Sequence, residues 1–471
     1  MVSSWANSLD LHLDVRGRGR GSGAALTRAL REAVRGGRLA PGVRLPSSRA
    51  LAADLGVARN TVADAYAELV AEGWLTARQG SGTRVAQRAE PRRARAGRPA
   101  PPTRHPLNPP VTYNLMPGQP DVSSFPRTAW ATATRRALAA APSEAFGYQG
   151  PAGRPELRAA LADYLARVRG VAADPERIVV CAGFAHGLRV LAQVLHGSGA
   201  RRVAVESYGL PPHHDILTRA GLRLAALPYD DGGTQTAGLG ELGADAVLMT
   251  PAHQFPTGVP LPPERRATAV DWARAAGGLI VEDDYDGEFR YDRQPVGALQ
   301  GLDPERVVYC GTASKSVSPA LRLGWMVLPR RLVGEVQEVL GGETGVVGSV
   351  DQLTLAEFIT SGAYDRHVRA MRMRYRRRRD RLVAELARKA PQVRVSGISA
   401  GLHALLELPA GTDEKAVVAS AAREGLAVSH LGLLTYAPPH TPRSAVIVGY
   451  ATPPDHLFPG ALAALCRALN A

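Results

Sequence analysis

Lys315 and its neighbours have side chains that can hold and activate a small ligand. Lys315 is one of few lysines in an arginine-rich chain, and it stands in the run GTASKSVSPALRLGW. A lysine held among apolar walls can lose its proton and condense with an aldehyde. Thr312 and Arg322, on either side of it, offer a hydroxyl and a guanidinium group to a doubly charged phosphate. The group therefore favours a phosphorylated aldehyde as its ligand.

Acidic side chains and a phenol stand together in the run VEDDYDGEFRY. A carboxylate opposite the lysine, such as that of Asp283, would keep a pyridinium nitrogen protonated, so that the ring can withdraw electrons. The hydroxyl of Tyr285 can bond to an oxygen on the same ring. Each residue also has a purely structural explanation, with Lys315 on the surface, Asp283 capping a helix and Arg322 in an ordinary ion pair. Their order along the chain favours one shared ligand, a phosphorylated pyridine aldehyde.

Short apolar strands separated by amphipathic stretches are predicted from Tyr113 onward. This alternation is typical of a largely parallel sheet covered by helices, and such sheets bind ligands at the carboxyl ends of their strands. The polar runs follow those ends, as does a turn at Gly183, Phe184 and Ala185, where free N–H groups at a helix start suit a phosphate. The predicted strands are residues 178–181, 202–205, 246–249, 279–281 and 307–309.

A compact helical pattern precedes this region. Ser47 or Ser48 can cap the second of three predicted helices, and Gly56 ends it. Two short helices joined by a tight turn form a helix-turn-helix, and the hairpin that follows them is a wing. The predicted helices are residues 24–35, 47–55 and 58–72, and the predicted strands of the wing are 74–76 and 83–85.

Residues of this helical part are placed where such proteins contact DNA. The start of the third helix is where a recognition helix meets base edges, and the start of the second helix suits phosphates. A glycine in the wing would let its backbone approach a duplex. The predicted base-reading residues are Arg59, Asn60 and Thr61, and the predicted backbone contacts are Arg44, Ser47, Arg49 and Gly80. These positions predict double-stranded DNA as a partner.

Charge and composition agree with a nucleic-acid partner. The formal net charge is +14, and residues 1–110 hold 18 arginines against 8 acidic residues. An arginine-biased, GC-rich genome would also raise the charge, but its concentration near one end favours DNA binding. The three cysteines are scattered, no apolar run is long enough to span a membrane, and the first residues lack a signal pattern. We therefore expect a cytoplasmic protein without membrane contact.

The N-terminal part resembles the GntR family of winged-helix regulators through the run LPSSRALAADLGVARNTVADAYAELVAEGWL. The rest resembles the fold-type I aminotransferases, and nearly the whole chain most closely resembles the MocR/GabR subfamily of GntR regulators. The resemblance implies an α/β protein with a winged helix-turn-helix domain over 1–87 and an aminotransferase-like domain over 113–471. A Pro- and Arg-rich stretch over 88–112 is expected to be a stiff, extended linker between them. The second domain should contain a mainly parallel central sheet and a smaller C-terminal α+β subdomain.

The resemblance also implies a cofactor, pyridoxal 5'-phosphate (PLP), bound to Lys315 as a Schiff base (an aldimine). Asp283 matches the group on the pyridine nitrogen, with Asp284 as an alternative, and Tyr285 matches the group on the ring hydroxyl. Tyr148, in the run FGYQGPAGRPEL, matches a tyrosine that reaches the phosphate from a neighbouring subunit, which implies a homodimer. The implied phosphate ligands are Thr312, Arg322 and the backbone of Gly183, Phe184 and Ala185.

Three positions depart from the aminotransferase pattern. Leu210 stands where an aromatic residue usually packs near the cofactor, and Phe255 replaces an asparagine. Arg443 lies out of register with the arginine that normally holds an amino-acid carboxylate. These departures favour a sensor over an enzyme.

The preferred interpretation is a PLP-dependent, DNA-binding transcription regulator with no metal site. Its effector would be PLP itself or an amino acid or amine, held in part by Arg443, and it would control vitamin B6 or amine metabolism. One alternative is a working aminotransferase with an appended DNA-binding domain. Another is a DNA-binding protein that uses the aminotransferase fold only as a dimerisation scaffold, which the retained lysine, aspartate, tyrosine and arginine disfavour.

An arginine-rich run over 366–381 has two interpretations. Helical spacing puts Val368, Met371, Tyr375 and Leu382 on one apolar face, with the arginines solvated opposite. The run could also be a second DNA-binding surface. We prefer the first interpretation.

Overall fold

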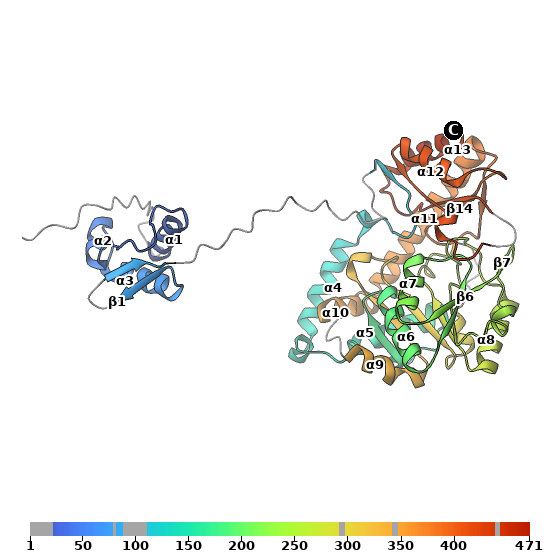
Figure 1. Ribbon diagram of the computed structural model, residues 1–471, viewed down its shortest axis with the longest axis horizontal. Coiled ribbons are helices and arrows are strands. Elements are labelled where there is room, and N and C mark those ends of the chain that lie inside the picture. The colour runs from blue at the N-terminus through green and yellow to red at the C-terminus, as the bar shows by residue number, and fades with distance from the viewer. Residues whose placement is uncertain (1–21, 79–81, 88–110, 292–296, 342–346, 439–442) are drawn as a thin grey trace, which may run out of the picture. The chain divides into compact units, whose positions relative to one another are not determined.

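The computed structural model describes residues 22–78, 82–87, 111–291, 297–341, 347–438 and 443–471 of the chain (Figure 1). The chain divides into two compact units, with the division after Thr103. Gly80 and all but the last two residues of the predicted linker lie outside the described residues. In the part of the chain that is described, no helix is long and apolar enough to cross a bilayer.

The first unit packs three helices with a two-stranded antiparallel hairpin, which confirms the predicted winged helix-turn-helix. The Ser47 hydroxyl accepts a hydrogen bond from the N–H of Ala50 and so caps the second helix. Gly56 ends that helix with a φ of 65°, a left-handed conformation that glycine adopts without strain. The elements are α1 (Ser22–Arg35), α2 (Ser48–Leu55), α3 (Arg59–Ala71), β1 (Leu75–Arg78) and β2 (Gly82–Val85).

Seven strands form the central sheet of the second unit, in the order β4-β12-β11-β10-β9-β5-β6. All neighbouring strands are parallel except that β12 runs antiparallel to both β4 and β11. The mainly parallel sheet is therefore confirmed. In chain order the strands are β4 (Ile178–Cys181), β5 (Arg202–Glu206), β6 (Arg223–Leu227), β9 (Ala246–Met249), β10 (Leu279–Asp283), β11 (Val307–Thr312) and β12 (Gly324–Val327).

Two of these strands, β6 and β12, were not among the predicted ones. β6 lies at the edge of the sheet and most of its side chains are only partly buried, so its apolar pattern is weak. β12 is a four-residue strand that directly follows the loop carrying Lys315 and Arg322. Its place in the sheet depends on pairing with β4 and β11, which are distant in the sequence.

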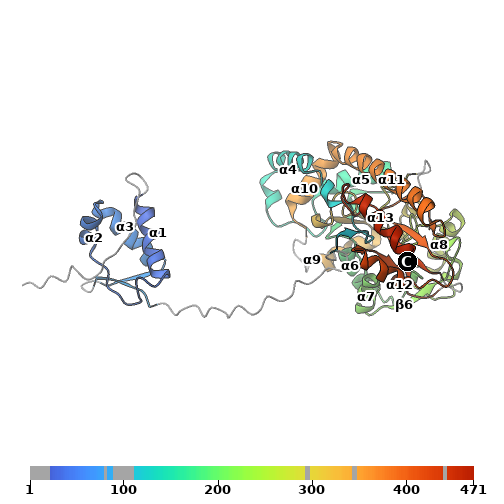
Figure 2. The ribbon, with the colours of Figure 1, turned by 90° about the horizontal axis from the view of Figure 1, so that it is seen from above.

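Helices cover both faces of the central sheet. In β4, Ile178 and Val180 pack with α5 and α10, whereas Val179 and Cys181 pack with α6, α7 and α9. Burial on both faces explains why the strands are continuous apolar runs rather than alternating ones. Both views show α4 and α10 side by side (Figure 1 and Figure 2). The helices are α4 (Arg127–Ala140), α5 (Pro155–Arg169), α6 (Phe184–Gly197), α7 (Pro211–Arg219), α8 (Pro263–Ala276), α9 (Val333–Gly341) and α10 (Ser349–Thr360).

A smaller antiparallel sheet, in the order β13-β14-β17-β16, forms the C-terminal α+β part. It packs with α12 and α13 and with α11 from Met371 onward, in a helix of 27 residues. The elements are α11 (Ala363–Lys389), β13 (Arg394–Ser396), β14 (Ala404–Glu407), α12 (Glu414–Arg423), β16 (Ser429–His430), β17 (Ala445–Val448) and α13 (Phe458–Leu469). Two short pairs join β3 (Tyr113–Asn114) to β15 (Leu426–Ala427) and β7 (Tyr229–Asp230) to β8 (Gly233–Thr234).

The long helix α11 corresponds to the arginine-rich run. Its predicted apolar face is confirmed, since all four predicted side chains are buried: Val368, Met371, Tyr375 and Leu382. One detail was wrong, because Arg378 is buried rather than solvated. Its guanidinium is ion-paired with Asp121 at 3.1 Å and Asp455 at 2.6 Å. These pairs provide the compensation that a buried cation needs.

Candidate functional site

β12 runs antiparallel to β4 and β11, so it begins beside the carboxyl ends of those two strands. The loop before β12, which carries Arg322, therefore lies at the same ends. The first residue of β12, Gly324, pairs with Cys181 at the end of β4 and with Thr312 at the end of β11. A Cβ atom on Gly324 would lie 2.8 Å from the Cα atom of Gly183, closer than side chains tolerate. Glycine at position 324 therefore permits the close approach of these segments.

Gly183, Arg322 and Thr312 surround the start of α6. Gly183 has a φ of 83° and precedes the helix, and the first N–H groups of a helix, here those of Phe184 and Ala185, have no partner within it. The Arg322 guanidinium lies 3.8 Å from the position that a Cβ atom on Gly183 would take. Thr312 is buried at the end of β11. A guanidinium, a hydroxyl and a helix N-terminus together can bind a phosphate dianion.

Asp283 and Asp284 occupy different environments, although they are adjacent at the end of β10. The Asp284 carboxylate accepts hydrogen bonds of 2.6 Å and 3.0 Å from Arg169 and one of 2.8 Å from the Tyr309 hydroxyl. The Asp283 carboxylate is also buried, but one of its oxygens has no hydrogen-bond partner among the described residues. Burial raises the pKa of Asp283 well above its usual range, although the nearby Lys315 opposes the shift. One oxygen of Asp283 can thus accept a hydrogen bond from a ligand, whereas the Asp284 carboxylate already accepts hydrogen bonds from Arg169 and Tyr309.

Lys315 lies half-buried in the segment after β11. Its Nζ atom donates a hydrogen bond of 2.5 Å to the carbonyl oxygen of Gly118, in the loop after β3. Burial lowers the pKa of Lys315, while Asp283 and Asp286 oppose this shift. A lowered pKa increases the fraction of neutral amine, which is the form that attacks an aldehyde.

Tyr285 is half-buried and belongs to a hydrogen-bonded group that was not predicted from the sequence. Its hydroxyl lies 3.0 Å from Nδ1 of His253 and donates to the His253 carbonyl oxygen at 3.1 Å. Nδ1 of His253 lies 2.8 Å from a carboxylate oxygen of Asp286. Both residues stand inside quoted motifs, His253 before the Phe-Pro-Thr-Gly turn and Asp286 after Tyr285. Their pairing could not be predicted, because 33 positions separate them and only the fold brings them together.

In the first unit, the predicted base-reading residues lie at the start of α3. Arg59 and Asn60 are exposed. Thr61 is half-buried, with its methyl group 3.7 Å from the position that a Cβ atom on Gly23 of α1 would take. Two side chains are therefore free to reach a base edge, and the third is held partly by α1.

The predicted phosphate contacts gather around α2 and the wing. Arg44, Ser47 and Arg49 are all exposed, and Ser47 also caps α2. The Nε atom of Arg44 lies 3.0 Å from the position that a Cβ atom on Gly82 would take, so its guanidinium lies along β2 of the wing. Gly80 lies outside the described residues and stays a prediction.

Two families match different parts of the chain. The family described as "Bacterial regulatory proteins, gntR family" matches residues 23–85, and "Aminotransferase class I and II" matches residues 112–445. The pyridoxine biosynthesis transcriptional regulator PdxR of Corynebacterium glutamicum is 35% identical over 415 residues, covering 86% of this chain and 87% of that protein. The probable rhizopine catabolism regulatory protein MocR of Rhizobium meliloti is 32% identical over 438 residues, covering 90% and 88%. The chain belongs to the MocR/GabR subfamily of GntR-type transcription regulators.

Solved structures similar to the second unit of this MocR/GabR-type regulator are aminotransferases. An archaeal alanine:glyoxylate aminotransferase has a TM-score of 0.68 and 23% identity, covering 76% of this chain and 90% of that one. An aspartate aminotransferase mutant of Thermus thermophilus has a TM-score of 0.67 and 24% identity, covering 76% and 92%. These similarities establish the fold of the second unit. The relatives over nearly the whole chain, in contrast, are named as transcription regulators.

The predicted effector-binding arginine of this MocR/GabR-type regulator is already paired. The Arg443 guanidinium donates a hydrogen bond to Glu407 and lies 5.9 Å from the centre of the Tyr229 ring. An effector carboxylate at this position would have to compete with Glu407. The pairing therefore weakens the case for Arg443 as a carboxylate ligand.

Apolar packing surrounds Tyr285 at the positions that depart from the aminotransferase pattern. Leu210, Phe255 and Tyr285 belong to one hydrophobic cluster, and the rings of Phe255 and Tyr285 meet edge to face at 6.0 Å. His213 is a second aromatic side chain nearby, with its ring 4.8 Å from that of Phe184. Burial lowers the pKa of His213 to about 4, with the charges of His214 and Lys315 contributing, so its ring is neutral near pH 7. Apolar side chains therefore lie in the same cluster as Tyr285 at two of the positions that depart from the aminotransferase pattern.

Tyr148, which was predicted to reach the cofactor of a neighbouring subunit, lies at the surface of the second unit. Its side chain is fully exposed, and so is a large part of the neighbouring Phe146. Two adjacent exposed aromatic side chains are typical of a surface that meets another protein. The placement of Tyr148 is compatible with a role in a partner subunit.

One group in the described residues has the composition of a metal site, although none was expected from the sequence. Ligand atoms of His253, Asp286 and His403 lie within 4.8 Å of one another, and all three side chains are buried. Hydrogen bonds from His253 to Asp286 and from His403 to the Pro256 carbonyl oxygen account for the arrangement. We therefore treat the group as a support for Tyr285.

Substitutions in the MocR/GabR-type winged helix should separate base reading from phosphate contact. Arg59→Ala is expected to weaken operator binding by about 1–3 kcal/mol and to relax the preference at one base pair. Arg44→Ala should weaken operator and unrelated duplexes alike and reduce the slope of the salt dependence by about one. Fluorescence anisotropy with operator and scrambled duplexes at several salt concentrations measures both effects. Unchanged binding in both variants would show that α3 does not enter the groove as assigned.

Proposed function

We propose that this transcription regulator binds PLP on Lys315 and uses it as a sensor that controls operator binding. The observation that carries the proposal is that one carboxylate oxygen of the buried Asp283 has no hydrogen-bond partner among the described residues. Asp283 is also close enough to Lys315 for its negative charge to act on the pKa of that lysine. A buried carboxylate without a donor is unfavourable, and a protonated pyridine nitrogen would supply that donor. Asp284 already accepts hydrogen bonds from Arg169, which supports Asp283 as the aspartate that meets the pyridine nitrogen.

The other residues of the site have roles that follow from their chemistry. When bound, PLP supplies an aldehyde and an electron-withdrawing ring. Lys315 supplies the amine that holds it, and Tyr285, oriented by His253, supplies a hydroxyl for the ring oxygen. The proposed phosphate ligands are Arg322, Thr312 and the backbone N–H groups of Gly183, Phe184 and Ala185, with Tyr148 of a second copy completing the site.

The proposal includes a homodimer in the cytoplasm, where the operator DNA is. The exposed Tyr148 and Phe146 support a dimer, because exposed aromatic side chains gain stability when another surface covers them. PLP itself is the preferred effector, with an amine or amino acid as the alternative. The pairing of Arg443 with Glu407 and the name of the relative PdxR both support PLP.

Cofactor binding has a direct chemical test. Protein supplied with PLP is expected to be yellow, and borohydride should fix the cofactor on Lys315. The chain has three lysines, Lys315, Lys389 and Lys415, so peptide mass spectrometry identifies the modified one without ambiguity. Lys315→Ala should remain colourless, whereas Lys415→Ala, at an exposed position, should behave as the wild type. A wild type that stays colourless with PLP, or a label on another lysine, would refute the proposal.

A further inference from the structure

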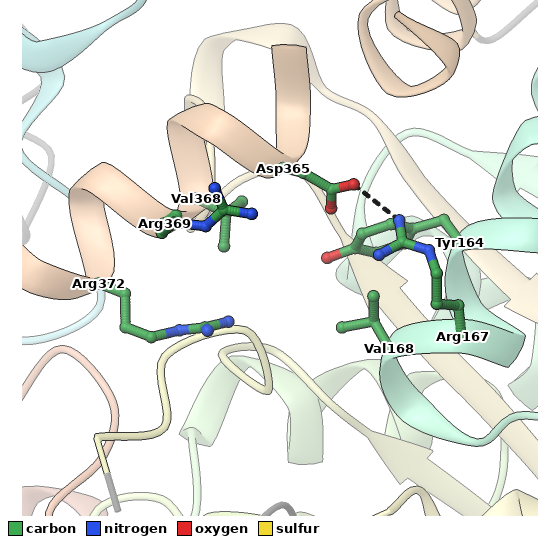
Figure 3. Close-up of a pocket in the computed structure, with 7 residues that line it drawn as sticks. All are labelled: Tyr164, Arg167, Val168, Asp365, Val368, Arg369 and Arg372. Carbon is green, nitrogen blue, oxygen red and sulfur yellow. Dashed lines mark hydrogen bonds and ion pairs between the residues drawn. The ribbon is translucent and has the colours of Figure 1, made fainter. Parts of the chain in front are cut away.

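A pocket lined by arginines lies between α5 and α11 (Figure 3). Its volume is about 170 Å³, and none of its lining residues belongs to the proposed cofactor site. A water molecule takes about 30 Å³ in the liquid, and pockets for drug-sized ligands have about 300–1,000 Å³. The pocket therefore has room for a compact group such as a phosphate with a short carbon chain.

Three guanidinium groups line this pocket from two sides. Arg369 and Arg372 extend from α11 toward the open space, and Arg167 lies across it on α5 (Figure 3). Arg167 donates to the Asp365 carboxylate at 2.8 Å, and Nε of Arg372 donates to the Glu288 carbonyl oxygen at 2.8 Å. Within the described parts of the chain, no hydrogen bond or ion pair is made by Arg369. Asp365 is the one carboxylate on the lining, so the pocket keeps an excess of positive charge.

The walls that carry these arginines are fixed by packing. Tyr164 and Val368 are buried in the hydrophobic core beside the central sheet, and Val168 packs against it. The Arg167 guanidinium lies 5.7 Å from the centre of the Tyr164 ring, within the range of a cation–π contact. The apolar walls of the pocket are therefore already formed, whereas the exposed side chain of Arg369 would be ordered by a bound ligand.

We propose that this pocket binds the phosphate group of a small phosphorylated molecule, at a site separate from the cofactor. A phosphate dianion has the charge to match the two guanidinium groups, of Arg369 and Arg372, that have no carboxylate partner. Guanidinium groups bind phosphate through paired hydrogen bonds, which an ammonium group cannot reproduce. The valines and the Tyr164 ring leave an apolar surface for the carbon part of the ligand.

Hydrogen bonds connect the pocket wall to the segment that carries Lys315. The hydroxyl of Tyr364, which precedes the lining residue Asp365, lies within hydrogen-bond distance of the Ser316 hydroxyl at 2.8 Å and of a Glu288 carboxylate oxygen at 3.2 Å. Glu288 also receives, through its carbonyl oxygen, the hydrogen bond from Arg372. Because Ser316 adjoins Lys315, hydrogen bonds link Arg372 of the pocket through Glu288, Tyr364 and Ser316 to the segment that carries Lys315.

The test uses the full chain and inorganic phosphate and glycerol 2-phosphate as probes, at constant ionic strength. Calorimetric titration of the wild type is expected to show saturable binding of both probes and none of glycerol. Arg369→Glu should weaken binding at least tenfold, or about 1.4 kcal/mol. Arg369 makes no contact that the fold needs, so this variant should fold normally.

Two control variants separate the pocket from other sources of anion binding. Arg377→Glu changes the same charge at an exposed position of the same helix, and Arg322→Gln removes the guanidinium of the proposed cofactor site. Saturable binding should survive in both. Binding lost in Arg322→Gln but kept in Arg369→Glu would assign the phosphate to the cofactor site and overturn the proposal.

Further outcomes would also overturn it. Equal weakening by Arg369→Glu and Arg377→Glu would indicate diffuse attraction of anions to a basic helix, and so would the absence of saturation in the wild type. Duplex DNA provides the last comparison. If Arg369→Glu weakens duplex binding far more than Arg377→Glu while phosphate binding is unchanged, Arg369 contacts a DNA backbone and no small-ligand site exists.

Discussion

Operator affinity of the wild-type protein is expected to change about 5- to 150-fold when PLP, alone or with a cognate amine, is added. The same titration with Lys315→Ala should show no change, because the ligand then lacks its covalent attachment. Such a change corresponds to a coupling free energy of about 1–3 kcal/mol, and by reciprocity operator DNA must change the affinity for the ligand by the same factor. Fluorescence anisotropy of labelled operator, with and without ligand, measures the first effect.

A turnover assay on the same preparation decides between a sensor and an aminotransferase. We expect production of keto acid from amino donors to be slow or absent. Leu210 and Phe255 place apolar side chains in the cluster that contains Tyr285, and Arg443 is already hydrogen-bonded to Glu407. Lys415→Ala is the matched control for loss of a lysine. Efficient production of keto acid over many turnovers, combined with an operator affinity that does not change when the ligand is added, would establish the enzyme interpretation.

Asp284→Asn is expected to lower the free energy of unfolding of the second unit by about 3–5 kcal/mol. The side chains of Arg169 and Asp284 are only 3% and 1% exposed, so Asp284→Asn removes the carboxylate charge that is ion-paired with a buried guanidinium. Urea unfolding of the cofactor-free protein, followed by hydrogen exchange of peptides from β10 and β11, measures the loss where it arises. Asp365→Asn, which breaks the more exposed pair with Arg167, should cost less than about 1 kcal/mol.

Asp283→Asn, unlike Asp284→Asn, should not lower the free energy of unfolding near pH 7 in the same measurement. Burial raises the pKa of Asp283, so the folded chain binds this proton more tightly than the unfolded chain does. The free energy of unfolding of the cofactor-free protein should therefore fall as pH rises from about 3.9, the ordinary pKa of aspartate, through the raised value. Asp283→Asn should remove this dependence, leave stability near pH 7 equal or higher, and abolish tight PLP binding. A large destabilisation near pH 7 would show that Asp283 is a structural residue.

Local patterns were sufficient for the helices and hairpin of the first unit, for five of the seven strands of the central sheet and for the order of the motifs. Ser47 and Gly56 delimit α2 as predicted, because capping and left-handed backbone are properties of short segments. The predicted strands coincide with β4, β5, β9, β10 and β11, because burial on both faces requires continuous apolar runs. The same patterns did not reveal β6, whose side chains are mostly only partly buried, or β12, a short strand whose antiparallel neighbours are far away in the sequence.

The sequence by itself determined the kinds of groups available: a lysine, adjacent acids, a phenol, a guanidinium and a basic helix-turn-helix. Only the tertiary structure decided which of them remain free to bind. It pairs Asp284 with Arg169 and leaves one oxygen of Asp283 without a hydrogen-bond partner among the described residues. It also pairs Arg443 with Glu407 and places Arg369 on the lining of the pocket between α5 and α11. The physical reason is that hydrogen bonds and ion pairs are made between side chains that are distant in sequence, and each bond already made removes a group from the set that can hold a ligand.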